Sequence, residues 1–493
     1  TDGISTLGSG IRDTRKRIGL VVGPGRDFMA LHNESRSLLT MSGWMAVAMA
    51  TGVLLCLWPS AASARSLKEA QAAFDKKQYQ EALDLVEQVT KEQGPQPEAR
   101  RLKIHSLILL AKPKDALVEY EHLERDLKQD DRALLKEVAL GFVYVLLKDM
   151  REQMRGAAYT ALKDVDSPEM IPALEDGLSD GSGLVRALAA EALGKLEAGR
   201  RSPRLRNALE DQAGLVKATV LKVLGKSGDR SVIPLLEKAL KDEQPAVRLA
   251  AAGALYHTGQ TAMWDTILKA ASAPNPEERA TALRMVGELK DARGLSVLLE
   301  AIPNTQPSVR GAAASALGDL GKVQGIPALE HALEDKIPAV KTSAAISLGE
   351  LGVKDSLVAL RKALADQNPV VKAAVVSALL RVEEPFESVG EELYELAQNH
   401  DPGTRSAAGK AAGRAHGANM KAAIEFLSGM LKDPIPRPRI AAARALGQIG
   451  GAEILPMLKL ALHDEDDAVR ATVGGSIARI LNHAKPSPNR AKS

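Results

Sequence analysis

Basic residues recur along the chain at an almost constant interval, and an acidic residue precedes most of them by six positions. Eight of the ten intervals between successive bases are 31 residues, and the other two are 33 and 34. Aspartate fills the preceding position in eight of the eleven units. A carboxylate and a base at fixed spacing can form charge-assisted hydrogen bonds. Because an enzyme does not repeat its active site eleven times, the pattern predicts a structural ladder.

The predicted ladder residues come from successive units of the repeat. They are Asp149, Arg155, Asp180, Arg186, Asp211, Lys217, Asp242, Arg248, Arg310, Asp335, Lys341, Asp366, Lys372, Asp433, Arg439, Asp464 and Arg470. Arg279 and Arg405 complete the series of bases, while Ala273, Asn304 and Asn399 replace the aspartate.

Each unit has the pattern of two helices joined by a short turn. The first resembles "IPALEHAL" and the second "VRGAAASALGDLG", in which Val309, Ala313 and Leu317 share one apolar face. Proline often precedes the base, and it favours a helix start because its missing N–H would be unpaired there. We expect Gly318 and Gly321 to close the second helix. With 45% hydrophobic but 3% aromatic residues, the composition favours closely packed Ala and Leu helices in a regular array.

The Asp–x–x–Pro–x–Val–Arg core, followed by "AAxALGxLG" and "IPALxxAL", resembles HEAT repeats of the short subtype named after phycobilisome lyases. The resemblance runs from Leu134 to His483 and implies an all-α, right-handed α-solenoid of about 11 repeats over residues 131–484. Residues 65–130 differ, and "AQAAFDKKQYQEALDLVEQV" resembles a tetratricopeptide hairpin. We expect this segment to cap the first repeat, and a plain helical hairpin is the alternative.

The uncharged stretch "WMAVAMATGVLLCLW", Trp44–Trp58, is followed by small residues that end at Ala64. Residues 41–64 therefore have the pattern of a signal peptide cleaved after Ala64, which predicts a periplasmic or secreted protein. The alternative is an inner-membrane anchor formed by uncleaved residues 44–58, although a span needs about 20 residues. Cleavage would remove the one cysteine, Cys56, and with it any disulfide or thiolate site.

The rest of the composition sets further limits. The net charge is +3, from 65 bases and 62 acids, which argues against a general nucleic-acid binder. We expect residues 1–40 to be a disordered leader and residues 485–493 a disordered tail.

A second column of polar residues lies nine positions after each base and should face the concave side of the solenoid. It is acidic in the middle and basic toward the C-terminus, and two more bases lie one turn away. The predicted partner-binding residues are Glu288, Asp319, Glu350, Arg381, Lys410, Arg414, Arg444 and Arg479. We interpret them as a gently curved surface that contacts a partner of complementary charge. A merely solvated face is the alternative.

Few residues suit catalysis. No two histidines have the spacing of a metal pair on one helix turn, and no phosphate-binding loop is present. We therefore predict a non-enzymatic, exported scaffold that binds another protein and uses no cofactor, metal or membrane after signal cleavage. Its oligomeric state stays open. An enzyme or enzyme subunit related to bilin lyases or to HEAT-like iron hydroxylases is the alternative, but the chain lacks the His-Glu dipeptide of those hydroxylases. Nucleic-acid binding through the C-terminal bases is a third hypothesis.

Overall fold

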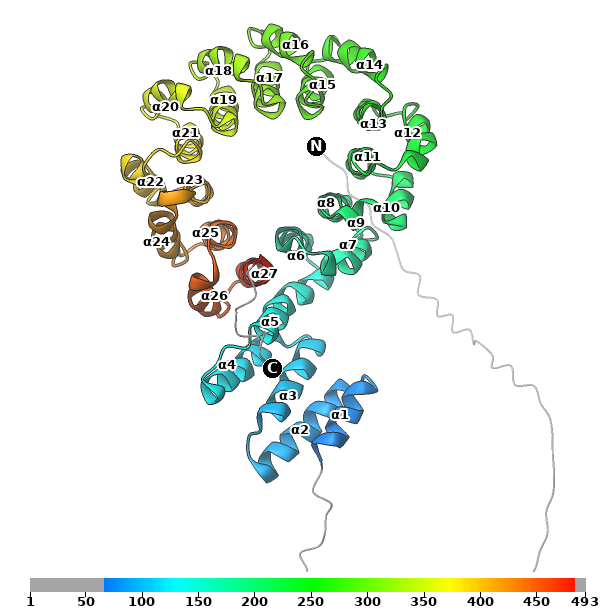
Figure 1. The fold of residues 1–493 in the computed structure, drawn as a ribbon, viewed down its shortest axis with the longest axis vertical. Helices are drawn as coiled ribbons and strands as arrows, with labels where there is room; N and C mark the ends of the chain where they lie inside the picture. Colours follow the sequence, from blue (N-terminus) through cyan, green and yellow to red (C-terminus); the bar gives the residue numbers. More distant parts are fainter. Residues whose placement is uncertain (1–65, 484–493) are drawn as a thin grey trace, which may run out of the picture. The chain divides into compact units, whose positions relative to one another are not determined.

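The computed structural model describes residues 66–483, which form helices and turns and contain no strand (Figure 1). The predicted all-helical solenoid is confirmed. No helix in this part of the chain is both long and apolar enough to cross a membrane. The predicted leader (1–40), the signal segment (41–64) with its cleavage site at Ala64, and the tail (485–493) lie outside the described residues.

Helices at the N-terminal end pair with their neighbours before the repeats begin, α1 with α2 and α3 with α4. Helix α1 starts at a capping box, in which Ser66 and Glu69 each satisfy the other's backbone amide. Tyr120 of α4 is buried and donates its hydroxyl to Asp130. The bounds are α1 (Leu67–Asp75), α2 (Tyr79–Gln93), α3 (Pro97–Leu109), α4 (Pro113–Leu127) and α5 (Arg132–Tyr144). Their tetratricopeptide character stays a prediction.

The second helices of the units form an inner layer, in which each contacts the next. Proline lies in the first turn of seven of them, where its missing N–H costs no hydrogen bond. The inner helices are α6 (Glu152–Val165), α8 (Gly183–Lys195), α11 (Gly214–Gly225), α13 (Pro245–His257), α15 (Pro276–Glu288), α17 (Pro307–Leu320), α19 (Pro338–Leu351), α21 (Pro369–Arg381), α23 (Pro402–Ala412), α25 (Pro436–Ile449) and α27 (Asp467–His483).

The first helices of the units form an outer layer (Figure 1). They are α7 (Ile171–Gly177), α9 (Glu197–Arg200), α10 (Pro203–Asn207), α12 (Ile233–Ala239), α14 (Met263–Ala271), α16 (Gly294–Ala301), α18 (Ile326–Ala332), α20 (Leu357–Ala363), α22 (Gly390–Ala397), α24 (Met420–Met430) and α26 (Leu455–Ala461). Short 3-10 turns lie at Val145–Lys148, Pro168–Met170, Ala208–Glu210, Arg230–Val232, Val323–Gly325, Lys354–Ser356, Phe386–Ser388, Gly417–Asn419 and Ala452–Ile454.

Glycines in the inner helices let neighbouring units approach closely. Gly321 ends α17 with a φ of 71°, as expected for a left-handed cap. Gly318 does not end the helix, contrary to the prediction: it lies within α17, and a Cβ there would be only 2.8 Å from the Cα of Ser347 in α19. A Cβ on Gly287 would similarly lie 2.7 Å from the Cα of Ala316. Close packing on the inner side bends the array toward that side.

The last inner helix closes the array on itself. Helix α27 packs against α25 and also against α5 and α6, and Figure 1 shows it between α25 and α6. Twelve of its 17 residues are buried. A Cβ on Gly474 would lie 2.2 Å from the carbonyl oxygen of Ala139, and a Cβ on Gly475 would lie 3.0 Å from the Cβ of Ala161. The repeats therefore form a closed ring, whereas the sequence predicted a gently curved surface.

Candidate partner-binding surface

The ladder bases lie in the first turn of the inner helices and reach forward to the next unit. Arg310 Nε lies 2.6 Å from one carboxylate oxygen of Asp335, and its Nη2 lies 3.0 Å from the other. Its Nη1 donates to the carbonyl of Asn304 at 2.8 Å. Asp335 also accepts the backbone amide of Ile337 at 2.8 Å. One guanidinium thus joins the turns of two successive units.

The other predicted ladder residues show the same contact or a variant of it. The two-pronged arginine contact recurs at Arg155–Asp180, Arg186–Asp211, Arg405–Asp433 and Arg439–Asp464. Single ammonium contacts join Lys217 to Asp242 and Lys341 to Asp366. At the ends and irregular units, Lys372 bonds Glu395, Asp149 bonds Arg151, and Arg470 bonds Asp467 and the carbonyl of Asp464. Within residues 66–483, the Arg248 side chain donates hydrogen bonds only to the carbonyls of Asp242 and Glu243.

The rungs stabilise charge at partly buried positions. The hydrogen bond from Arg310 holds the pKa of the Asp335 carboxyl below its usual range, and Arg186 does the same to the pKa of Asp211. The Arg310 and Asp335 side chains are only 17% and 12% exposed, so removing one partner would leave a poorly solvated charge.

An acidic group lies on the inner face, where α15, α17 and α19 end. Asp319 is partly buried, and burial together with nearby Glu350 and Glu288 raises the pKa of its carboxyl. Lys222 forms an ion pair with Glu288 at 2.8 Å across two units of the ring. Asp319 and Glu350 form no ion pair within residues 66–483. We call Glu288, Asp319 and Glu350 the inner acidic group.

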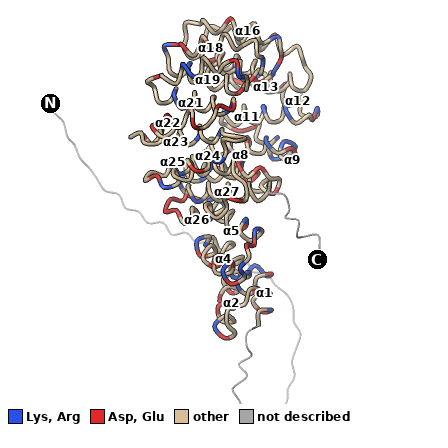
Figure 2. Tube along the Cα trace, turned by 60° about the vertical axis from the view of Figure 1, so that its left-hand side comes forward, with Lys and Arg blue, Asp and Glu red and all other residues tan. Residues whose placement is uncertain are grey.

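A basic group follows it around the ring. Arg381 ends α21, and Lys410 and Arg414 are one turn apart at the end of α23, the neighbouring inner helix. None of the three side chains has a carboxylate partner in the described part of the chain. By contrast, acidic and basic residues are interspersed over the whole array (Figure 2). Many of them form ion pairs. We call Arg381, Lys410 and Arg414 the inner basic group.

Two of the predicted partner-binding residues, Arg444 and Arg479, form contacts that close the ring. Arg444 Nε lies 2.8 Å from the Asp164 carboxylate, 280 residues earlier in the chain. Arg479 donates to the backbone carbonyl of Asp164 at 3.0 Å. Both bases were expected to be free for a partner because the sequence pattern showed only their register. Lys459 adds an ion pair from the last unit to Glu124 of α4, and His463 Nε2 lies 2.7 Å from a carboxylate oxygen of Glu121.

The ring has pockets on both sides of the inner layer. On the inner face, a pocket of about 420 Å³ includes Lys195, Lys222, Lys226 and Glu288 among its lining residues. Lys222 was not among the predicted surface residues, although it lies five positions after its ladder base, as Lys410 does. The position five residues after a ladder base could therefore have identified Lys222 from the sequence.

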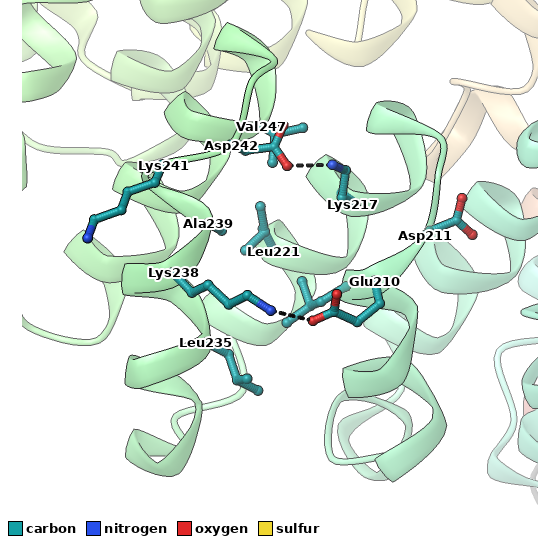
Figure 3. Close-up of a pocket in the computed structure, with 11 residues that line it drawn as sticks. Glu210, Asp211, Lys217, Leu221, Leu235, Lys238, Ala239, Lys241, Asp242 and Val247 are labelled. Carbon is teal, nitrogen blue, oxygen red and sulfur yellow. Dashed lines mark hydrogen bonds and ion pairs between the residues drawn. The ribbon is translucent and has the colours of Figure 1, made fainter.

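A second pocket, of about 350 Å³, lies between two adjacent units (Figure 3). The Lys217–Asp242 rung bounds one side of it, and an exposed ion pair between Lys238 and Glu210, at 2.8 Å, bounds the other. Leu221 and Val247 contribute apolar lining. Four of its six charged lining residues form these two ion pairs and Asp211 is bonded to Arg186, so Lys241 is the one charged lining residue without an ion pair within residues 66–483.

No three His, Cys, Asp or Glu side chains between residues 66 and 483 gather in a way that could hold a metal ion.

A family model described as HEAT repeats matches seven overlapping stretches of the chain. They are residues 139–214, 202–266, 264–349, 304–380, 332–412, 359–436 and 390–478. The predicted resemblance to HEAT repeats is confirmed by these matches.

Solved structures show weaker similarity. Human deoxyhypusine hydroxylase in complex with glycerol is 21% identical, with 51% of this chain and 98% of that one covered and a TM-score of 0.29. A chain of the CpcE–CpcF complex of phycocyanin lyase from Nostoc sp. is 22% identical, with 46% and 93% covered and a TM-score of 0.34. These likenesses are too low to transfer an activity to this chain. No curated protein matches it.

Proposed function

Because this chain belongs to the HEAT-repeat family, we propose that it is a non-enzymatic scaffold that binds another protein on the inner face of its ring. The inner basic group is the observation that supports this proposal. Three cations lie at the ends of adjacent inner helices and have no carboxylate partner among residues 66–483, although the ladder and the outer surface contain many ion pairs. A partner with acidic side chains would supply the carboxylates that these three cations lack in the described part of the chain.

The inner acidic group makes the charge of the proposed surface change from negative to positive along the ring. It precedes the inner basic group around the ring, and the pKa of Asp319 is raised by its burial and by the nearby charges of Glu350 and Glu288. A partner segment with bases toward one end and acids toward the other would complement both groups. Arg444 and Arg479 do not belong to this surface because they contact Asp164.

The test reverses the charge of the inner basic group. Arg381→Glu, Lys410→Glu and Arg414→Glu are combined, and the variant is used as bait in an extract of the source cells. The matched control reverses three exposed bases away from the inner face, Lys336, Lys421 and Lys432, none of which forms an ion pair within the described residues.

Mass spectrometry should identify a protein retained by the wild type and by the control but lost from the inner-face variant. Equal retention by all three baits would contradict the proposal, provided that circular dichroism shows all three to be folded.

We further propose that the protein is exported to the periplasm or beyond. The support is the uncharged Trp44–Trp58 stretch followed by small residues up to Ala64. Sequencing the N-terminus of the protein purified from its natural source tests this, and a mature chain that still contains residues 44–58 would contradict cleavage.

A further inference from the structure

One rung of the ladder lacks its carboxylate. In five rungs, an arginine places Nε and Nη2 against the two oxygens of an aspartate 25 or 28 residues later. For Arg248, the residue 25 positions later is Ala273, which has no polar side chain. Arg248 Nε and Nη2 consequently have no hydrogen-bond partner within residues 66–483.

The Arg248 side chain nevertheless makes the same backbone hydrogen bonds as the arginine of a complete rung. Its Nη1 donates to the carbonyls of Asp242 and Glu243 at 2.8 and 2.9 Å. Arg310 makes the same two contacts to its own unit, at 2.8 and 3.2 Å. Arg248 is only partly buried, and its free nitrogens are not among the buried groups that lack a partner, so they face solvent.

A second guanidinium lies on the other side of the position that the missing carboxylate would occupy, which we call the gap at Ala273. Arg279 donates Nε and Nη2 to the carbonyl of Ala273 at 2.9 and 2.7 Å. In a complete rung this position holds a carboxylate between two bases, as Asp180 lies between Arg155 and Arg186, both of which lower its pKa. The position that a carboxylate occupies in a complete rung therefore lies between Arg248 and Arg279 here, and no carboxylate of residues 66–483 bonds to either arginine.

We propose that the gap at Ala273 binds a single carboxylate side chain, Asp or Glu, from a partner polypeptide. The two free nitrogens of Arg248 match the two oxygens of a carboxylate. The surrounding charge selects against more highly charged anions, because Glu243 and Glu277 are exposed beside Arg248 and at the start of α15. A partner acid flanked by lysine or arginine suits both the gap and its acidic border. This docking point lies where the inner helices begin, apart from the inner acidic and basic groups.

The test follows the Nε–Hε signals of ¹⁵N-labelled arginine in the full chain by NMR. Arg248→Lys identifies the Arg248 signal, and Arg310→Lys identifies that of a complete rung. Sodium acetate should shift the Arg248 signal saturably and leave the Arg310 signal in place. Ala273→Asp should abolish the response, because the new carboxylate occupies the gap. Asp335→Ala should transfer the same response to Arg310, and, if that variant does not fold, Ala273→Asp alone decides.

Further titrations identify the class of ligand. A capped Lys-Glu-Lys peptide should bind several times more tightly than acetate, and the matched Lys-Gln-Lys peptide should not shift the signal. The absence of a saturable Arg248 shift, or a response that survives Ala273→Asp, would overturn the site. Tighter binding of inorganic phosphate than of acetate would overturn its preference for carboxylates. Equal binding of acetate and Lys-Glu-Lys would overturn the polypeptide partner.

Discussion

The contact between α27 and the start of the array can be weakened by one methyl group. We consider Gly474→Ala, in which the new Cβ would lie 2.2 Å from the Ala139 carbonyl oxygen. Real Cβ atoms essentially never come within 3.0 Å of a heavy atom of a neighbouring helix, so α27 must withdraw from α5. The displacement is roughly 1 Å, and a gap of that size forfeits about a quarter to a half of a dispersion contact.

The cost follows from what α27 buries. Val469, Val473, Ile477 and Ile480 are all at most 4% exposed. At about 2 kcal/mol for each buried branched side chain, they contribute roughly 8 kcal/mol. Losing a quarter to a half of this predicts a destabilisation of about 2–4 kcal/mol. Gly429→Ala is the control: no heavy atom lies within 4 Å of its added Cβ, and it should stabilise α24 by up to about 1 kcal/mol.

The assay measures ring closure directly. Ser179 and Lys432 are exposed and each precedes a ladder base by seven residues, on either side of the seam. Fluorescent labels at cysteines in these two positions, in a Cys56→Ser background, should lose energy transfer at lower urea concentration in Gly474→Ala than in the wild type. An unchanged urea midpoint would refute the steric argument and the close contact of α27 with α5.

Three more predictions follow from the charged contacts. Ala273→Asp should complete a rung with Arg248 and raise the free energy of unfolding by about 1–2 kcal/mol in urea titrations, and a loss of stability would contradict the pairing. Asp319→Asn should stabilise the protein at pH 7, because the raised pKa indicates that ionisation of this carboxyl is disfavoured in the fold. The gain in stability should vanish as the pH falls below the ordinary pKa of 3.8, and a pH-independent gain would contradict this explanation. Asp164→Arg should lower the free energy of opening the ring by about 1–3 kcal/mol, measured by energy transfer between the same two labels. The second change Arg444→Asp should restore much of that loss, and no restoration would exclude a direct ion pair.

The sequence predicted what depends on one unit and its immediate neighbour. The 31-residue spacing placed Arg310 and Asp335 on successive turns, where the structure has them 2.6 Å apart. Proline before the base marked the start of the inner helices for the same local reason. Such features repeat, so each unit reinforces the pattern of the others.

Closure was not predicted because it depends on a small rotation summed over all the units. That rotation is set by how closely residues such as Gly287 and Gly318 allow inner helices to pack, and spacing alone does not show it. The sequence of the last inner helix did contain one indication of closure. A terminal repeat usually has a polar outer face, whereas "AVRATVGGSIARI" in α27 is apolar or small on nearly every side. A helix with that composition needs a second neighbour.

The closed seam also changes how the array can unfold. A linear solenoid has two ends, and terminal units fray because each has only one neighbour. Here the last inner helix contacts the first, so every inner helix from α6 to α27 has neighbours on both sides. Local opening must then break two interfaces at once, and the seam must join residues about 300 positions apart, as Asp164 and Arg479 are at 315. We therefore expect slow final closure during folding and uniform hydrogen-exchange protection around the inner layer.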